Sequence, residues 1–353
     1  MEEIRPLEHP FEAKAGDLAP HAGVVAVVGR TNAGKSTLVN RLVGEKVSIV
    51  SPVPQTTRSV VRAVLTEPRG QIALLDTPGL HKSESLLGTE MNKRARESLG
   101  GADAALLVVD AARAPRLEDD GWTRRLVRSE IPVFVFLNKT DETDRSDAFR
   151  ALWDRVRAED AAREAEAAAA QAARDARPPE ETEKIPPWKR KGRARRAPAP
   201  FAEPVWIRGS AKTGAGTGEL LDALFGALPP GPLLFDGDTV SDHPRRVAVA
   251  DVIREKLIGL LRDELPHAVG VRVDDIADRP GEPVLVRGTV LVCRSGQKGV
   301  VLGEKGRTLR AATRASEREL ADFFGAPVRV ELWIRVEPDW NRNFFLLRQL
   351  GYV

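Results

Sequence analysis

The sequence is poor in cysteine, methionine and tyrosine, and it has no long hydrophobic run. Among 353 residues there are one cysteine, two methionines and one tyrosine. A single cysteine, Cys293, excludes an internal disulfide and a metal site built from several cysteines, and we interpret it as a small buried residue of a strand. No apolar segment approaches the roughly 20 residues that cross a bilayer, and residues 1–5 are unlike a signal peptide. We therefore expect a cytoplasmic protein.

A large excess of charge is also absent. The formal net charge is only +3, so a surface that binds nucleic acid must arise from local clustering of charge. The clearest cluster is the basic run at 189–196, which follows an Ala/Arg/Glu tract at 161–176. Within residues 151–200 we expect an insertion made of a solvated helical extension and a flexible loop. It is either tolerated without a partner or contacts RNA or a membrane surface.

The most informative segment is G-R-T-N-A-G-K-S-T at 29–37, because it joins an apolar run at 24–28 to a helical pattern. The pattern G-x-x-x-x-G-K-[ST] binds phosphate through backbone N–H groups and a lysine, and it binds Mg²⁺ through a hydroxyl. A nucleoside triphosphate is the predicted ligand, with Ser36 on the Mg²⁺. The predicted nucleotide-binding residues of this segment are Gly29, Asn32, Ala33, Gly34, Lys35, Ser36 and Thr37.

Further apolar runs at 60–66, 71–75, 104–109, 132–137 and 205–207 alternate with helical patterns. This alternation predicts a mainly parallel sheet covered by helices, with ligands at the carboxyl ends of its strands. Asp76 follows one run and suits an indirect Mg²⁺ contact, whereas Asp141 follows another and can accept two N–H bonds from guanine. The other site residues expected in these loops are Gly79, Asn138, Lys139, Ser210, Ala211 and Lys212.

Four such loops in this order make residues 24–228 resemble the translation-factor-like GTPases, as their first, third, fourth and fifth motifs. The resemblance implies hydrolysis of GTP to GDP and phosphate. It also implies a second-motif threonine that binds Mg²⁺ and the γ-phosphate, which we assign to Thr57, with Thr56 as the alternative. Lys35, Thr57 and Gly79 are the predicted catalytic residues.

Two positions of the catalytic loops depart from a Ras-like pattern. Leu80 stands where Ras-like proteins carry a glutamine that orients water, and leucine cannot do this. His81 is the next polar candidate, although a lone histidine on a mobile loop more often faces solvent. Asn32 stands where related GTPases carry an asparagine that helps to hold K⁺, so the resemblance implies a K⁺ site. The alternative, that Asn32 only shapes the loop, also stays open.

A second domain is expected after a proline-rich stretch. We predict a flexible arm at 1–22, a GTPase domain at 23–229, a short stiff linker at 230–235 and an α+β KH domain at 236–353. In the KH domain we expect a helix whose inner face carries Ile253, Leu257, Leu260 and Leu261. Strands are expected at 269–276, 284–293 and 328–334, and a long helix at 308–324.

A G-x-x-G sequence at 303–306 precedes the long helix. In KH domains such a loop clamps the backbone of about four nucleotides. The predicted RNA-binding residues are Lys298, Gly299, Gly303, Glu304, Lys305, Gly306 and Arg307. Glu304 departs from the family pattern and should weaken RNA binding unless the neighbouring basic residues outweigh it.

Residues 24–353 as a whole resemble the Era family of bacterial GTPases with a carboxyl-terminal KH domain. The matching segments are 54–58, 254–257, 264–266, 297–299, 332–334, 339–340 and 350–352. The resemblance implies a monomer that binds GTP, GDP and the 3′ end of 16S ribosomal RNA, matures the 30S subunit and associates peripherally with the inner membrane. A different RNA-linked GTPase and an RNA chaperone with a structural nucleotide remain as alternatives.

Overall fold

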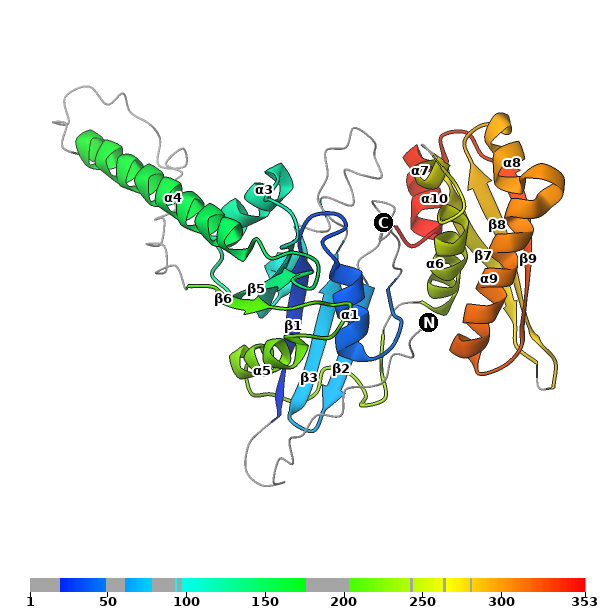
Figure 1. The fold of residues 1–353 in the computed structure, drawn as a ribbon, viewed down its shortest axis with the longest axis horizontal. Coiled ribbons are helices and arrows are strands. Elements are labelled where there is room, and N and C mark those ends of the chain that lie inside the picture. The colour runs from blue at the N-terminus through cyan, green and yellow to red at the C-terminus, as the bar shows by residue number, and fades with distance from the viewer. Residues whose placement is uncertain are drawn as a thin grey trace, which may run out of the picture.

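The computed structural model describes residues 20–48, 61–77, 93, 97–175, 203–241, 244–262, 265–279 and 281–352. An α/β domain is followed by a smaller α+β domain, which lies on the right in Figure 1. This arrangement confirms the predicted fold class. No helix within the described ranges is long and apolar enough to cross a membrane.

A mainly parallel sheet forms the first domain. Its strand order is β2-β3-β1-β4-β5-β6, and only β2 runs antiparallel to its neighbour. The strands agree with the expected runs to within a few residues. They are β1 (His21–Val28), β2 (Val61–Glu67), β3 (Gly70–Asp76), β4 (Ala104–Asp110), β5 (Val133–Asn138) and β6 (Val205–Arg208). The helices are α1 (Lys35–Val43), η1 (Ser98–Gly101), α3 (Leu117–Leu126), α4 (Ser146–Asp175) and α5 (Thr217–Ala227).

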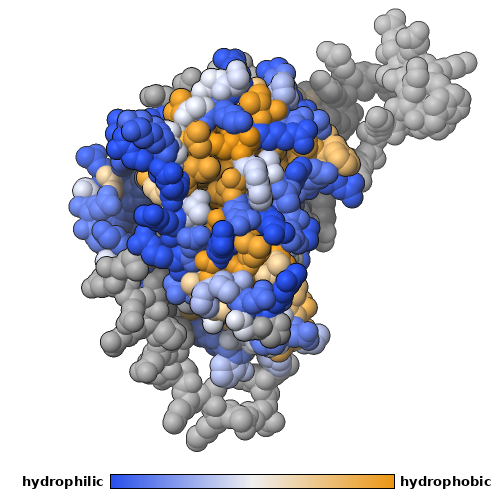
Figure 2. Space-filling model, turned by 90° about the vertical axis from the view of Figure 1, so that its right-hand side faces the viewer, coloured by the Kyte–Doolittle hydropathy of each residue, from blue (hydrophilic) through white to orange (hydrophobic). Residues whose placement is uncertain are grey.

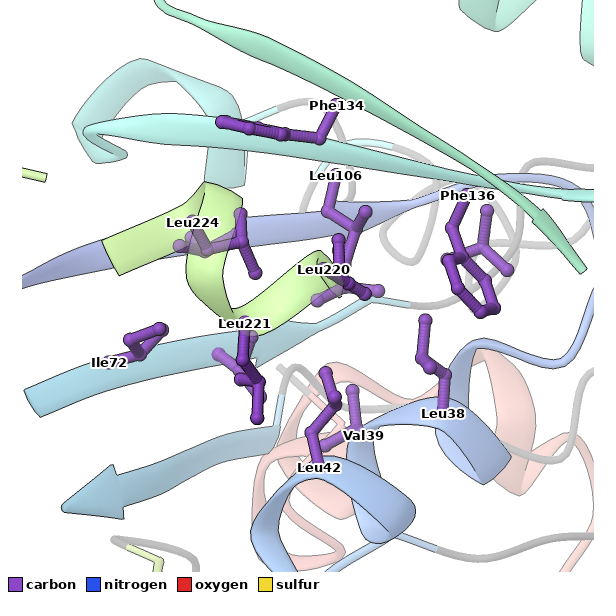
Figure 3. Close-up of a cluster of buried hydrophobic side chains, with 14 of the residues drawn as sticks. Leu38, Val39, Leu42, Ile72, Leu106, Phe134, Phe136, Leu220, Leu221 and Leu224 are labelled. Atoms are coloured by element: carbon purple, nitrogen blue, oxygen red, sulfur yellow. The ribbon is translucent and has the colours of Figure 1, made fainter. Parts of the chain in front are cut away.

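Helices cover both faces of this sheet because the central strands are apolar on both sides. On one face α1 and α5 pack against the sheet. Figure 3 shows Leu38 of α1 beneath Phe136 of β5, and Leu220 of α5 beneath Leu106 of β4. On the other face α3 and α4 cover the sheet, with Trp122 and Trp153 buried. The two layers hold the strands rigidly, so the loops at their ends have fixed positions.

Two predicted boundaries of the first domain are wrong. The arm expected to reach residue 22 ends earlier, because His21 and Ala22 pair with β3 as the start of β1. The insertion expected from residue 151 begins later, because Leu152, Trp153 and Val156 lie in the core. The exposed part of α4 begins after Asp160, where the alanine-rich tract continues the helix to Asp175.

The segment after α5 remains attached to the first domain beyond the linker predicted at 230–235. Gln71 of β3 is fully buried and donates to the carbonyl of Phe235 at 3.1 Å, while its Oε1 accepts from the N–H groups of Leu234 and Phe235 at 2.8 Å. The N–H of Val64 donates to the carbonyl of Val240 at 2.8 Å. The described contacts therefore carry the first domain past Asp236, where we expected the second to begin.

The second domain is a three-stranded sheet with α6 and α9 on one face. Strand β8 pairs antiparallel with β7 and parallel with β9. Its strands are β7 (Gly270–Ala277), β8 (Val284–Val292) and β9 (Val328–Val336). Its helices are α6 (Arg245–Ile258), α7 (Leu265–Ala268), α8 (Ser295–Leu302), η3 (Glu304–Gly306), α9 (Arg307–Phe324), η4 (Trp340–Arg342) and α10 (Phe344–Gln349).

Apolar side chains fill both faces of this sheet at one end. The main core lies under α6 and α9, and the carboxyl-terminal segment adds a second cluster around Trp340, Leu347 and Tyr352. Cys293 follows β8 and is only partly buried against this cluster. Leu260 was expected in the core but is 48% exposed, because α6 ends at Ile258 and the helical period is lost there.

Candidate functional site

The polar loops identified in the sequence meet at the carboxyl edge of the first sheet. They follow β1, β3, β5 and β6, which lie near one another in the sheet order. Ligands of open α/β sheets bind at this edge. Thr56, Thr57, Gly79, Leu80 and His81 fall outside the described residues, so their assignments stay predictions.

The loop between β1 and α1 requires glycine at two positions. Gly34 has φ of +99°, and a Cβ atom there would collide with the Nδ2 atom of Asn138. Gly29 has φ of +145°, and its Cβ would collide with the carbonyl oxygen of Val108. Both the left-handed backbone and the close approach exclude a side chain. The loop therefore turns tightly into the N-terminus of α1, where backbone N–H groups attract anions.

Lys35 lies buried inside this loop. Its Nζ donates to the carbonyls of Gly29 at 3.1 Å and Arg30 at 3.0 Å. Burial lowers the pKa of Lys35 to about 8, and the nearby carboxylate of Asp76 acts in the opposite direction. A bound phosphate group would raise the pKa of Lys35 towards its ordinary value, since an anion within a few ångströms favours the protonated form.

Ser36 and Asp76 form the part of the site that fits a magnesium ion. The hydroxyl of Ser36 donates to Asp76 Oδ2 at 2.7 Å, and Asp76 is fully buried at the end of β3. Burial raises the pKa of Asp76, whereas Lys35 and Ser36 lower it. Its second oxygen, Oδ1, makes no hydrogen bond of normal geometry within the described ranges. A hydroxyl and a carboxylate at a phosphate loop are the oxygen donors that Mg²⁺ prefers.

Asn138 connects the phosphate loop to the loops after β5 and β6. Its Nδ2 donates to the carbonyl of Ala33 at 2.8 Å, and its Oδ1 accepts from the N–H of Ala211 at 2.8 Å. Lys139, in the left-handed region with φ of +65°, donates from Nζ to the carbonyl of Asn32 at 3.0 Å. The structure thus brings three of the predicted loops into one hydrogen-bonded unit.

The residues expected to contact the base lie at the rim of this unit. Asp141 is exposed on the turn after β5, so its carboxylate is accessible to a ligand. Ser210 is buried, and Arg41 of α1 holds the following backbone by donating to the carbonyls of Ala211 at 3.3 Å and Lys212 at 2.6 Å. Thr37, in the first turn of α1, is half-buried.

A buried ion-pair cluster behind the phosphate loop was not found from the sequence. Arg30 is 4% exposed, and its guanidinium lies 3.0 Å from Asp110 Oδ2 and 3.3 Å from Asp119 Oδ2. Lys139 Nζ lies 2.9 Å from the same oxygen of Asp110. Burial raises the pKa of Asp119, although the hydrogen bond from the N–H of Arg116 and the charge of Arg30 act to lower it. The sequence feature that could have indicated this cluster is Asp110, a carboxylate at the end of β4 on the same sheet edge.

The predicted RNA-binding loop lies between α8 and α9. Gly303 and Gly306 have φ of +71° and +77°, and Lys305 is also left-handed at +51°. Glu304 forms an ion pair with Arg307 on the exposed surface, so each charge is partly balanced by the other. Lys298 and Gly299 belong to α8 rather than to the loop itself.

Apolar surface accompanies this loop on the second domain. Figure 2 views the molecule from the side of the second domain and shows a band of apolar side chains between hydrophilic margins. Large apolar residues of this domain that are exposed include Val300, Leu302 and Trp333. Unstacked bases bind such surfaces while their phosphates contact basic residues.

The two domains contact each other through charged side chains in the turn after α1 and on α6 and α9. Lys46 Nζ, in the turn after α1, lies 2.9 Å from Glu255 Oε2 and 2.6 Å from Glu319 Oε1. Lys256 pairs with the same two carboxylates. Although burial raises the pKa of Glu319, hydrogen bonds from Lys256 and Lys46 outweigh this effect and lower the pKa. The second domain is thus attached shortly before residues 49–60, which include the predicted second motif.

Comparisons with known proteins agree with both domains. Residues 24–139 match the family model described as a 50S ribosome-binding GTPase, and residues 264–341 match the KH domain. The chain is 34% identical to GTPase Era from Lacticaseibacillus paracasei over 332 residues, which cover 94% of this chain and 97% of that protein.

Solved structures with the same two-domain arrangement were also found. The chain is similar to Aquifex aeolicus Era bound to GDP·AlF4⁻, with 31% identity and a TM-score of 0.76. It is equally similar to Era in complex with MgGDPNP and nucleotides 1506–1542 of 16S ribosomal RNA, with 32% identity and a TM-score of 0.76. Each comparison covers 94% of this chain and 99% of the solved chain.

Proposed function

Because the chain belongs to the Era family of GTPases, we propose that it binds the 3′ end of 16S ribosomal RNA and acts in assembly of the 30S subunit. It is an enzyme that binds GTP and hydrolyses it to GDP and phosphate. The observation that carries the proposal is the presence, on one chain, of a phosphate loop and an exposed G-x-x-G loop. The similar Era chain holds MgGDPNP and this RNA together.

We assign the nucleotide contacts to the loops that meet at the sheet edge. Backbone N–H groups of the loop at 29–37 bind the β- and γ-phosphates, and the ammonium of Lys35 moves from its two carbonyl partners to these phosphates. Asp141 accepts the guanine N–H bonds, while Asn138 holds the phosphate loop and Ala211 in register. Magnesium, held by Ser36 with Asp76 in indirect contact, supplies positive charge to the phosphates.

Potassium is a further part of the proposal. The backbone of Asn32 is left-handed with φ of +60°, its carbonyl accepts from Lys139, and the residue is exposed above the loop. This arrangement supports a role for Asn32 in holding K⁺, which supplies charge near the transferred phosphate. The test compares phosphate release in KCl and NaCl of matched ionic strength, and Asn32→Ala should remove any preference for KCl. Equal rates in wild type would reject the potassium site.

The proposal also covers the location of the protein, its oligomeric state and its contact with a membrane. We place the protein in the cytoplasm, as a monomer, with peripheral contact to anionic membrane made by the basic run at 189–196. That run lies outside the described residues. Sedimentation with anionic vesicles should decrease when this run is replaced by a neutral segment, and unchanged sedimentation would reject the membrane contact.

The main test measures RNA binding and GTP hydrolysis on the same preparation. RNA of nucleotides 1506–1542 is titrated at fixed salt with GDP and with a non-hydrolysable GTP analogue, and phosphate release is followed with Mg²⁺. We expect tighter RNA binding with the GTP analogue. Lys305→Glu, in the exposed loop, should weaken RNA binding and leave phosphate release in the absence of RNA unchanged. RNA binding without phosphate release would favour a chaperone with a structural nucleotide.

A further inference from the structure

A stripe of arginine side chains runs along the outer face of α9, directly after the G-x-x-G loop. Its members, hereafter the arginine stripe, are Arg307, Arg310, Arg314 and Arg318. Successive members are three or four residues apart, which places them on one side of a helix of 3.6 residues per turn. The buried residues of the same helix, Ala312, Ser316 and Leu320, lie on the opposite side. The arginine stripe therefore faces solvent along about 16 Å of helix.

The charges of the arginine stripe are poorly balanced within the domain. Arg314 and Arg318 are exposed and form no ion pair in the part of the chain that the structure describes. Glu317, the nearest acidic residue of the helix, accepts a hydrogen bond from the N–H of Val330 at 3.0 Å instead. Like charges four residues apart destabilise a helix. If this face served only to contact solvent, alternating positive and negative side chains would make α9 more stable.

An open groove lies beside the second half of the arginine stripe. Its volume is about 640 Å³, and it is lined by Arg314, Glu317, Arg318, Ala321, Pro327 and Val328. The lining thus combines three apolar side chains and two guanidinium groups with one carboxylate, that of Glu317. This combination suits a nucleotide, whose base contacts apolar side chains while its phosphate pairs with arginine.

The arginine stripe is continuous with the predicted RNA-binding loop. Arg310 donates from Nη2 to the carbonyl of Lys305, and a Cβ placed on Gly306 would lie 3.4 Å from the Arg310 guanidinium. An RNA backbone clamped by the loop can therefore continue along the arginine stripe, where the carboxylate of Glu317 accepts a hydrogen bond from the N–H of Val330. Its phosphates would also relieve the repulsion among the arginines.

We propose that the arginine stripe and its groove form a second RNA contact, which binds the phosphate backbone of nucleotides adjoining those held by the G-x-x-G loop. The proposal rests on the RNA binding proposed above, and it adds the outer face of α9 to the protein surface that contacts the RNA. Arg314 and Arg318 contribute affinity that depends on RNA length and salt rather than on base identity, because they contact phosphates.

The test uses two single-stranded RNAs from the segment 1506–1542, one of about six nucleotides and one of about 14, so that only the longer can pass beyond a clamp of about four nucleotides. Wild type should bind the longer RNA at least about tenfold more tightly at low salt, with a steeper salt dependence. The double variant Arg314→Gln, Arg318→Gln should lose that advantage and reduce the salt slope by about 1.4, since each single-strand contact contributes roughly 0.7. Its affinity for the shorter RNA should not change.

The matched control is Arg279→Gln, Arg287→Gln, which removes the same charge from the β7–β8 side of the domain. It should bind both RNAs like wild type. If the control lost as much affinity for the longer RNA as the stripe variant, the effect would come from net charge alone and the proposal would be overturned. The proposal also fails if the stripe variant binds both RNAs normally, or loses the shorter RNA to the same degree. If wild type binds neither RNA, the proposed function itself fails.

Two further measurements distinguish an RNA contact from a structural role of the arginines and from membrane binding. The thermal midpoint of the stripe variant should equal or exceed that of wild type at low salt, because repulsion within α9 is removed. A lower midpoint together with equal losses on both RNAs would assign the arginines a structural role. If the variant loses binding to vesicles of anionic phospholipid but keeps the preference for longer RNA, the stripe serves a membrane and the proposal is overturned.

Discussion

The nucleotide site and the RNA-binding face differ in how far their charged side chains are buried and paired. At the nucleotide site Arg30, Asp110 and Lys139 are held by partners, and Arg30 and Asp110 are nearly inaccessible to water. On α9 the arginines are exposed, and Arg314 and Arg318 form no ion pair within the described ranges. The first arrangement fixes a geometry before the ligand arrives, and the second leaves charge available to a ligand of variable shape.

This contrast fits the chemistry of the two ligands. Stabilisation of a transferring phosphate depends on donors placed within a fraction of an ångström, so the interactions of the first domain serve rigidity. A nucleic-acid backbone is long and flexible, and its affinity comes mainly from displaced counterions. Exposed arginines on a helix are sufficient for that purpose.

The largest effect is expected when the buried cluster loses its arginine. Arg30→Ala leaves the carboxylates of Asp110 and Asp119 without their shared guanidinium, and breaking a buried pair in this way costs about 3–5 kcal/mol. The free energy of unfolding should fall by that order in urea titrations. Arg314→Ala, an exposed arginine substitution of the same size, should change it by less than about 0.5 kcal/mol. Equal effects would remove the distinction between the two regions.

The second effect concerns the exposed carboxylate of the nucleotide site. Asp141→Asn replaces an acceptor by a donor, so the affinity for GTP should fall by about 100-fold or more while the affinity for xanthosine triphosphate rises. The fold should tolerate the change because Asp141 is exposed. Competition between the two nucleotides against a fluorescent GDP analogue measures it. Retained GTP affinity would contradict the assignment of Asp141 to guanine.

The third effect follows from the pKa of Lys35, which burial lowers from 10.5 to about 8. Phosphates raise that pKa again, so GTP binding takes up a proton above pH 8, and the affinity should fall as pH rises, by up to tenfold per unit. In the absence of nucleotide, the stability of the folded chain depends on pH in the opposite direction. The unfolded chain binds more protons between pH 8 and 10.5, so stability should rise with pH across that window.

Calorimetry in buffers of different ionisation enthalpy measures the proton taken up on GTP binding. Lys35→Met should abolish both pH dependences, because it removes the titrating group. It should also weaken GTP binding at every pH, because it removes the ammonium that we assign to the phosphates. RNA binding without nucleotide serves as the control. It should show no such proton uptake, because Lys35 belongs to the nucleotide site and not to the RNA-binding face.

The smallest effect is expected at the contact between the domains. Lys46→Ala removes the link from the turn after α1 to Glu255 and Glu319, and partly exposed pairs are worth about 1 kcal/mol or less. The ratio of RNA affinities with a GTP analogue and with GDP should change by about two- to fivefold, and by reciprocity GTP affinity should respond to RNA by the same factor. Arg163→Ala, on exposed α4, is the control. An unchanged ratio would place the coupling elsewhere.

Local patterns identified most of the first domain correctly. The alternation of apolar runs predicted every strand of its sheet, and the loops at the strand ends contain Lys35, Asp76, Asn138 and Asp141 at one edge. These predictions succeed because the parallel sheet brings the carboxyl ends of its strands together. In the second domain the long helix and the strands were also placed correctly.

Boundaries and long-range pairs were predicted less well. Composition placed the insertion at residue 151, whereas Leu152 and Trp153 belong to the core. It placed the start of the second domain at Asp236, whereas Val240 is still bonded to Val64 of the first domain. Composition reports helix propensity and chain stiffness, and neither property says which surface a segment packs against. Such contacts join residues far apart in sequence and have no local signature.

The sequence by itself determined the fold class, the family and the loops that carry the chemistry, because these depend on local periodicity and on short motifs with fixed backbone requirements. Tertiary structure alone decided that Arg30 joins Asp110 and Asp119 behind the phosphate loop, and that Lys46 meets Glu319 across the domains. It also left Arg314 and Arg318 of α9 without an ion pair among the described residues, whereas Arg307 of the same helix pairs with Glu304. A charge acquires its role from the partners that folding brings within a few ångströms, and the order of residues does not contain those distances.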